Sequence, residues 1–563
     1  MKKYIGIDIG TTTICAVCLD EAGRILLCDK RPNRTVEFAR QDPDEILASI
    51  RKLVRGMMDE QGEIQAIGIS TQMHGMVYVD EQGKACSPLY TWQDTHGNDS
   101  ISEDMREVLE EKDHVDKETE AGYTGTKRGY TDTKRGYTAA EPNDGGMETY
   151  CSQLSRITGY SVATGYGLCT HYYHLKNYLV PELAHKICTI GDYAAMQLCG
   201  LKEPVMHPSN GAGFGMFDTC EKNFDLDAVS RAGIDVGILP KISKERILGT
   251  TPEGIKVWIA IGDNQASVYG SVPVEGGIPT DGIQITVGTS AQITFVTDEN
   301  LSRQEEKMQE SFIVSKQEEK MQENFIASKQ EKKIQELSKT SKGEGKQPDS
   351  KAKLEVRPFL GGKQLLVGAA LCGGFAYQLV RDFFAETLSL FCSGADNYPE
   401  SRMNQESRTN QESRMKPESR MNQESQANRE RWTANLYTAM NRAAEKVYES
   451  GKCVPAADTR FLGSRSNPSL SGAFTGIRPD IFHPGEMCLA VLKGIVEELY
   501  QFYLQKDADE KIKVIYGSGN GLRQNPLLVK LLEERFGRKI LLSEITEEAA
   551  YGAGKFAMTQ ENM

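Results

Sequence analysis

The sequence lacks the features that direct a chain into or across a membrane. No apolar run reaches the ~18 residues that a membrane-spanning helix needs. The opening Met1-Lys2-Lys3 is followed at once by a strand-like stretch without a cleavage site, so we expect no signal peptide. The 13 cysteines include no Cys/His cluster with zinc spacing, and Cys15 and Cys18 fall on opposite faces of a strand-like run. Reduced thiols and a cytoplasmic location are therefore expected.

The chain also lacks an excess of positive charge. It carries 66 Lys and Arg against 79 Asp and Glu, which gives a net charge of −13. This balance disfavours nucleic acid and anionic membrane surfaces as partners. The 563 residues are 39% hydrophobic and 26% charged, a composition typical of soluble globular proteins. Because this length exceeds a single core, we expect two large lobes.

Three polar segments interrupt the chain with short internal repeats. A Gly-Tyr-Thr element, a Ser-Lys-Gln-Glu-Glu-Lys element and a Glu-Ser-Arg element recur, in this order, over residues 122–138, 302–340 and 399–425. These segments are too short and too polar to stack into a solenoid. We interpret them as insertions in surface loops, with a docking element as the alternative, over about residues 105–147, 298–353 and 394–430.

Apolar periodicity predicts two α/β lobes of similar plan. Strand-like stretches at the start of the chain precede a helix whose apolar face runs from Ile46 to Met57, and a further strand ends at Ser70. A second pattern of this kind starts near Val257. We therefore predict an α/β fold with an N-terminal lobe over residues 1–250 and a C-terminal lobe over 251–563.

Two short motifs have the composition of phosphate-binding turns. In Asp8-Ile-Gly-Thr-Thr-Thr13 a carboxylate at a strand end precedes a glycine and three threonines, whose hydroxyls and backbone amides can donate to phosphate oxygens. Asp8 can hold Mg²⁺ directly or through water. The turn Gly288-Thr289-Ser290 is a second candidate, although a tight hairpin explains it equally well.

Asp263 is the candidate for a general base. It follows an apolar strand in the run Ile261-Gly-Asp-Asn-Gln265. Phosphoryl transfer to an alcohol needs a group that accepts the hydroxyl proton, and an aspartate can do so late in the reaction. A helix N-cap is the alternative role for Asp263.

Further polar and glycine-rich loops suit a sugar and an adenine ring. The run Gln72-Met73-His74 follows a strand, and Trp92-Gln-Asp94 lies on a loop, so an aromatic ring and polar groups can meet sugar hydroxyls there. A lone histidine such as His74 is more often a structural hydrogen-bonding group. The turn Gly517-Ser-Gly-Asn-Gly521 is open enough to admit a flat adenine against the backbone.

The order of these motifs resembles the FGGY family of carbohydrate kinases. The resemblance covers nearly the whole chain outside the repeats and includes Ser87-Pro-Leu-Tyr-Thr-Trp-Gln-Asp94 and Gly472-Ala-Phe-Thr-Gly-Ile477. Two positions depart from the family pattern: His171 stands where a lysine is usual, and Lys493 where an acidic residue is usual. The resemblance implies two actin-like, ribonuclease H-like ATPase lobes with a cleft between them.

The same resemblance implies roles for individual residues. Asp263 is the expected catalytic base, and Asp8 is expected to place Mg²⁺ and ATP. The residues expected near the nucleotide are Thr11, Thr12, Thr13, Gly288, Thr289, Gly373, Gly374, Gly517, Gly519, Asn520 and Gln524. Those expected near the sugar are Gln72, Met73, His74, Trp92, Asp94, Asp263 and Asn264.

The sugar itself is less well defined by the sequence. The segments 165–167 and 206–217 look most like sedoheptulokinases, which implies transfer from ATP to a terminal hydroxyl of sedoheptulose. Xylulose, gluconate and glycerol are alternatives, and a homodimer is one arrangement left open. Two other classes of function are a catalytically silent sugar sensor and a mechanical ATPase. The retained Asp8 and Asp263 argue against the sensor, and the sugar-type loops argue against the mechanical ATPase.

Overall fold

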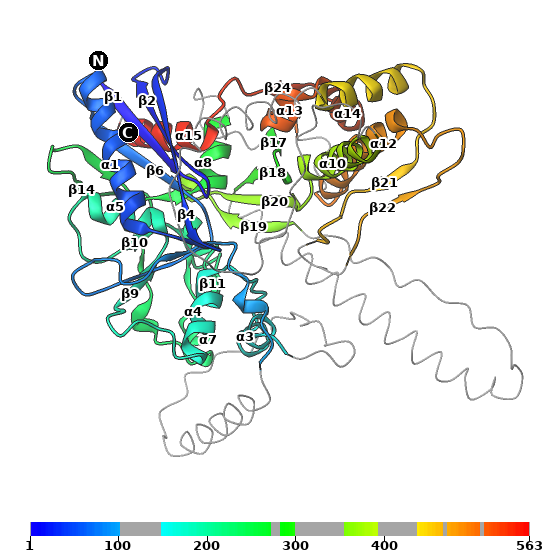
Figure 1. The fold of residues 1–563 in the computed structure, drawn as a ribbon. Coiled ribbons are helices and arrows are strands. Elements are labelled where there is room, and N and C mark those ends of the chain that lie inside the picture. The colour runs from blue at the N-terminus through cyan, green and yellow to red at the C-terminus, as the bar shows by residue number, and fades with distance from the viewer. Residues whose placement is uncertain are drawn as a thin grey trace, which may run out of the picture.

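A computed structural model describes residues 2–101, 148–271, 282–298, 354–391, 436–464, 470–506 and 512–561. The three repeat segments lie outside these residues. Figure 1 shows two lobes side by side, each built on a β-sheet. Among the described helices, none combines the length and the apolar character needed to cross a bilayer.

A seven-stranded sheet forms the centre of the first lobe. Its order is β14-β15-β6-β1-β2-β3, with β16 also paired to β6. The strands are β1 (Lys3–Ile9), β2 (Thr13–Asp20), β3 (Ile25–Pro32), β6 (Ala66–Thr71), β14 (Ile247–Thr250), β15 (Lys256–Trp258) and β16 (Ile261–Gly262). Strands β1, β2 and β3 are antiparallel, whereas β6 runs parallel to β1, β15 and β16. The sheet therefore continues past residue 250, where the sequence predicts the lobe boundary.

Helices cover both faces of this sheet. On one face lies α1 (Pro43–Gln61), which begins where Asp42 accepts hydrogen bonds from the backbone amides of Asp44 and Glu45. Its apolar face packs with α5 (Ile190–Leu198) and with Cys18 of β2. Cys15 lies in a different cluster, with residues of the C-terminal helix, so the predicted opposite orientation of the two cysteines is confirmed.

The second lobe repeats the plan of the first. Its six-stranded sheet has the order β19-β20-β18-β17-β23-β24, and β23 runs parallel to β17 and β24. The strands are β17 (Gly282–Val287), β18 (Ala291–Thr297), β19 (Glu355–Pro358), β20 (Gln364–Ala370), β23 (Val514–Ser518) and β24 (Ile540–Leu542). Its helices are α10 (Gly374–Phe391), α12 (Pro484–Tyr503), α13 (Asn520–Gln524) and α14 (Pro526–Phe536).

Two helices join the lobes. The C-terminal helix α15 (Glu548–Glu561) returns to the first lobe and packs against β1, β6 and α8 (Asp263–Ser271), as Figure 1 shows. This close approach requires glycine in the strands, because a Cβ atom on Gly6 or Gly68 would lie 2.0 Å from a carbonyl oxygen of α15. A shared apolar cluster contains Tyr4 of the first sheet and Val367 of the second. The two lobes are therefore packed against each other through this apolar cluster.

Smaller elements extend the lobes. The first lobe adds β4 (Thr35–Glu37), β5 (Arg40–Gln41), β7 (Val77–Val79), β8 (Leu89–Tyr90), α3 (Tyr150–Thr158), α4 (Gly167–Lys176), β9 (Lys186–Cys188), β10 (Val205–Met206), α6 (Pro208–Gly211), β11 (Phe217–Asp218), β12 (Asn223–Phe224), α7 (Leu226–Arg231) and β13 (Lys241–Ile242). Within the described residues, three short 3₁₀ helices are η1 (His96–Asn98), η3 (Val236–Ile238) and η4 (Leu360–Gly362). The second lobe adds the hairpin of β21 (Ala456–Asp458) and β22 (Ala473–Thr475).

Candidate active site

Three neighbouring strands of the first sheet end at the same edge. Asp8 of β1 lies opposite Ser70 of β6, which in turn lies opposite Ile261 of β16. Because the three strands are parallel, the segments that follow them emerge together. The candidate turn after β1, the polar loop after β6 and Asp263 after β16 are therefore neighbours, although more than 180 residues separate the last two in sequence.

Two carboxylates lie close together at this edge. Burial and then the nearby charge of Asp263 raise the pKa of Asp8 to about 7, although the Ser70 hydroxyl, which donates to Asp8 Oδ1 at 2.8 Å, opposes the rise. Burial also raises the pKa of Asp263 to about 6, against the amide of Asn264 and the charge of Arg357. Both side chains stay partly exposed, so solvent or a ligand can reach them. Such a pair is typical of a catalytic or cation-binding site.

The pair fits Mg²⁺ only together with a substrate. Within the described residues, no cluster of three or more His, Cys, Asp or Glu side chains is arranged to hold a metal. Magnesium commonly takes one or two carboxylates and completes its shell with water and substrate phosphates. Asp8, with Asp263 nearby, meets this requirement.

Asp263 opens helix α8, and its neighbours fix its backbone. The Asp263 Oδ1 atom accepts from the Asn264 backbone amide at 2.7 Å. The side chain of Asn264 reaches the second lobe, donating to Gln292 Oε1 at 2.9 Å and accepting from Arg357 Nη1 at 3.3 Å. Asn264, predicted to meet the sugar, thus uses both ends of its amide to tie the base to the other lobe.

The threonine turn and the predicted sugar residues form one network. Thr11 donates to Gln72 Oε1 at 3.0 Å and accepts from the indole nitrogen of Trp92 at 2.9 Å. Gln72 donates onward to Gln41 Oε1 at 3.1 Å, and the indole of Trp92 stays 48% exposed. The hydroxyl of Thr11, predicted to contact phosphate, therefore faces the sugar-type residues. Thr12 is exposed at the tip of the turn, and Thr13 closes it by accepting from the Gly10 amide at 3.0 Å.

Met73 and His74 lie beside the strand end that carries Asp263. A Cβ atom on Gly262, the residue before Asp263, would lie 3.2 Å from the sulfur of Met73. His74 adopts a left-handed backbone with φ of 80°, its Nδ1 lies 2.7 Å from the Gly213 carbonyl, and its ring stacks on Tyr166 at 4.6 Å. Strained backbone of this kind concentrates at functional sites.

Asp94 and His171 are buried and support this region through hydrogen bonds. Asp94 is 2% exposed, and its carboxylate accepts from the His96 amide at 2.9 Å and contacts His96 Nδ1 at 2.7 Å, which shapes the loop that carries Trp92. His171 is buried, and its Nδ1 lies 2.8 Å from the hydroxyl of Tyr78, so the replacement for the family's usual lysine belongs to a buried hydrogen-bonded group. Burial lowers the pKa of His171 to about 4.

The predicted nucleotide residues gather at one edge of the second sheet. The Gly374 amide donates to the Gly288 carbonyl at 2.7 Å, and the Gly373 amide donates to that of Thr289 at 2.8 Å. Gly519 has a φ of +89°, and a Cβ atom there would lie 2.4 Å from the Val287 carbonyl. The turns after β17, β20 and β23 therefore meet, as the sequence predicts.

The N-terminal end of the 18-residue helix α10 opens at this edge, starting at Gly374. The Gly374 and Phe375 amides at this end donate to the carbonyls of Gly288 and Thr289, so it is the helix dipole that favours an anion such as phosphate here. Asn520 and Gln524 lie on the short helix α13, where the Gln524 carbonyl accepts from Asn441 Nδ2 at 3.2 Å. Glu548 at the start of α15 accepts from the Gly519 amide at 3.4 Å, which ties this turn to the first lobe.

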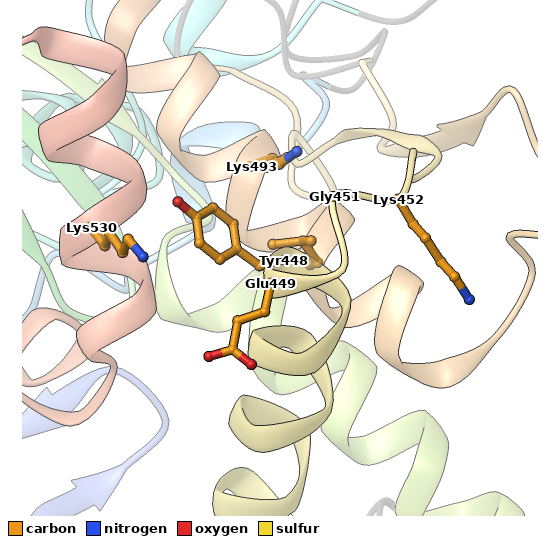
Figure 2. A pocket seen from close by; sticks show the side chains of 7 residues that line it. Tyr448, Glu449, Gly451, Lys452, Lys493 and Lys530 are labelled. Atoms are coloured by element: carbon orange, nitrogen blue, oxygen red, sulfur yellow. The ribbon is translucent and has the colours of Figure 1, made fainter.

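A separate hollow of about 490 Å³ lies on the second lobe, lined by Tyr448, Glu449, Gly451, Lys452, Leu489, Lys493 and Lys530. Figure 2 shows Lys530 directed toward Tyr448, where its ammonium lies 4.5 Å from the ring centroid. Helical residues 436–449 end at this hollow, and basic side chains near a helix C-terminus complement its dipole. No predicted site residue lines it, so we place the candidate active site elsewhere.

Several residues of the site escaped prediction from sequence. Ser70 bonds to Asp8 and Gln41 bonds to Gln72, and both pairs are distant in the sequence. Only the folded structure shows that these residues belong to the site. Ser209, which accepts from the Gly262 amide at 3.0 Å, lies in the segment 206–217 used for the family resemblance, but no spacing rule marks it. Glu548 could be predicted as a site residue only with the knowledge that the last helix returns to the first lobe.

Comparisons with known proteins agree with this arrangement. Residues 3–129 match the N-terminal domain, and residues 408–561 the C-terminal domain, of the FGGY family of carbohydrate kinases. The chain is 27% identical over 331 residues to the sedoheptulokinase of Mus musculus, covering 51% of this chain and 58% of that relative. It is 29% identical over 99 residues to the xylulose kinase of Escherichia coli, covering 16% of this chain and 20% of that relative. The chain thus matches little more than half the length of the mouse relative and a fifth of the length of the Escherichia coli relative.

Solved structures resemble the whole chain. A ligand-bound xylulose kinase from Lactobacillus acidophilus superposes with a TM-score of 0.64 at 16% identity, covering 100% of this chain and 90% of that one. A Plasmodium falciparum glycerol kinase with ADP has a TM-score of 0.62 at 16% identity, with the same coverage. At these identities the likeness concerns the fold.

The sheets, their shared plan and the facing loops define a two-lobed α/β protein of the actin-like class, which confirms the predicted fold. The class is broad, but both domain models of one family match the sequence in the expected order. The chain belongs to the FGGY family of carbohydrate kinases.

Proposed function

We propose that this protein transfers the γ-phosphate of ATP to a terminal hydroxyl of a ketose, with sedoheptulose as the first candidate. The observation that carries the proposal is the pair of Asp8 and Asp263 between a hydroxyl-rich sugar-type network and a glycine-rich anion site. The mouse and human relatives are named sedoheptulokinases, which favours that sugar over xylulose.

In this mechanism Asp263 is the base. The sugar hydroxyl oxygen attacks the γ-phosphorus, the bond from phosphorus to the bridging oxygen of ADP breaks, and the hydroxyl proton passes to a carboxylate oxygen of Asp263. The raised pKa of about 6 makes Asp263 a stronger base than an ordinary aspartate while leaving it mostly ionised at neutral pH. When bound, Mg²⁺ neutralises phosphate charge, and Asp8 is the residue to hold it.

The remaining residues position the two substrates. Trp92 presents an aromatic face to the sugar, and Thr11, held in turn by the buried Gln72, fixes the Trp92 side chain. The turn of Gly288 and Thr289 lets the phosphates of ATP approach the backbone closely, and the dipole at the start of α10 favours their negative charge. Closure of the lobes would exclude water and so suppress hydrolysis of ATP.

The test is an ADP-release assay with Mg²⁺ and ATP against sedoheptulose, xylulose, ribulose, gluconate, glycerol and no sugar. We expect release that depends on one ketose, and the phosphorylated position can be read by NMR. Release of ADP with xylulose alone would make xylulose the substrate and leave the proposed kinase reaction unchanged. Binding of a sugar without any release by the folded, ATP-bound protein would instead support a silent sensor and refute the kinase.

A further inference from the structure

A buried chain of hydrogen-bonding groups runs from the catalytic strand toward the second lobe. The Gly262 amide, directly before Asp263, donates to Ser209 Oγ at 3.0 Å. Ser209 Oγ lies 2.8 Å from His207 Nδ1, and His207 Nε2 lies 3.7 Å from Glu245 Oε1. Glu245 also accepts from the Gly361 amide of the second lobe at 2.8 Å.

The geometry fixes the direction of each proton in this chain. The Ser209 backbone amide donates to His207 Nδ1 at 3.1 Å, so that nitrogen carries no proton and acts as an acceptor. Because Ser209 Oγ accepts from Gly262, its own proton is available for the same nitrogen. The ring proton of His207 then lies on Nε2, on the side of Glu245.

Ser209 and His207, the two middle members of the chain, are shielded from water. Ser209 is 0% exposed and His207 is 2% exposed. Burial favours the neutral form of Glu245, but hydrogen bonding to His207 and to the Gly361 amide outweighs it and holds the pKa of Glu245 below its ordinary value. Glu245 is therefore a fixed negative group that orients the imidazole.

Helix α6 and the residues that follow it contact both sides of the proposed reaction centre. Asn210 donates to the carbonyl of Ala260 at 3.2 Å, so residues 209 and 210 form hydrogen bonds with the backbone on either side of Ile261. Three residues later, the Gly213 carbonyl lies 2.7 Å from His74 Nδ1 in the sugar-type loop. One short segment therefore fixes the distance between the strand before Asp263 and the sugar-type loop.

We infer that Ser209 and His207 are positioning residues for Asp263, holding its backbone at a set distance from the sugar-type loop, with Glu245 as the group that orients His207. The inference rests on the proposed function, since it assigns the support of that base. Ser209 has no access to substrate and is not itself catalytic. A displacement of ~1 Å at a reacting group can cost on the order of 100-fold in rate, which sets the scale of the effect.

The test compares four variants of the full chain. Ser209→Ala and His207→Ala break the chain, whereas His207→Asn keeps it, because the Asn carbonyl oxygen can replace Nδ1 as the acceptor at this helix start. Ser230→Ala is the control, since the exposed Ser230 bonds only to the Leu226 carbonyl of its own helix. We expect kcat to fall ~10- to 100-fold in the two disrupting variants, with the KM for ATP within about 2-fold, and to recover substantially in His207→Asn.

A second readout does not depend on activity. Amide hydrogen exchange at Gly262 should accelerate in Ser209→Ala and stay unchanged in Ser230→Ala, because only the first removes the acceptor of that amide. Unchanged exchange at Gly262, or an unchanged kcat in an active, folded Ser209→Ala protein, would overturn the inference. A wild-type protein that phosphorylates no sugar would refute the proposed function, while the exchange result would still decide whether Ser209 holds the strand.

Discussion

Replacing Asp8 by Asn should make the protein more stable at neutral pH while removing its activity. The folded protein raises the pKa of Asp8 from 3.8 to about 7, mainly through burial and then through the charge of Asp263. Each pKa unit corresponds to ~1.4 kcal/mol, so the rise amounts to at most ~4 kcal/mol of destabilisation once Asp8 is ionised. Since Asp8 is partly exposed and titrates together with Asp263, we expect ~2 kcal/mol.

The raised pKa of Asp8 also predicts how the stability difference between Asp8→Asn and the wild type changes with pH. A raised carboxyl pKa means that the folded state holds a proton which the unfolded chain releases near pH 3.8. The stability contributed by protonated Asp8 is therefore complete below that pH and is lost as the pH rises to about 7. Asn keeps the hydrogen bond from Ser70 and carries no charge, so its advantage should be about half as large at pH 5.5 as at pH 8.

Scanning calorimetry without nucleotide is the assay. The midpoint of Asp8→Asn should exceed that of the wild type by a few degrees at pH 8 and by less at pH 5.5. Asp59→Asn, on the exposed face of α1, should change neither midpoint appreciably. Mg²⁺ and ATP should then stabilise the wild type more than the variant. A lower midpoint for Asp8→Asn at pH 8, or a gain independent of pH, would refute the reasoning.

Three further outcomes follow from the site and the packing. Asp263→Asn should lower kcat by ~100- to 10,000-fold while calorimetry still detects ATP binding, and near-normal turnover would remove Asp263 as the base. Trp92→Phe, which deletes the hydrogen bond to Thr11, should raise the sugar KM several-fold and leave the ATP KM unchanged in steady-state assays. Gly6→Ala should destabilise the protein severely, because its Cβ would lie 2.0 Å from the Ala550 carbonyl, whereas Gly56→Ala in helix α1 meets nothing within 4 Å and should stabilise by ~0.5–1 kcal/mol. Equal thermal midpoints for the two glycine variants would contradict the packing of α15.

The elements with strong local patterns were predictable from sequence. The hairpin around Gly288, the helix that begins at Pro43 and the strand before Gly517 all lie where periodicity and turn residues indicate. Glycines at the strand ends also marked the nucleotide edge of the second lobe, because a close backbone approach there leaves a local signature.

The pairings between distant segments were not predictable. No local pattern shows that β6 lies between β1 and β16, yet this strand order brings Asp8 next to Asp263. Nor does composition reveal that Thr11 bonds to Trp92, or that the last helix crosses to the first lobe. These contacts depend on tertiary structure, and one sequence carries no direct record of them.

The repeated plan of the lobes explains why the two edges of the site do different chemistry. Asp8 lies one residue before the end of β1 and bonds to Ser70 on the parallel neighbour β6. At the corresponding place in the second lobe, Thr286 lies one residue before the end of β17 and bonds at 2.7 Å to Ser518 on the parallel neighbour β23. One position therefore carries a carboxylate in the first lobe and a neutral hydroxyl in the second. A carboxylate suits a cation or a base but would repel phosphate, so a hydroxyl at the second position leaves the glycine-rich edge free to receive the anionic end of a nucleotide.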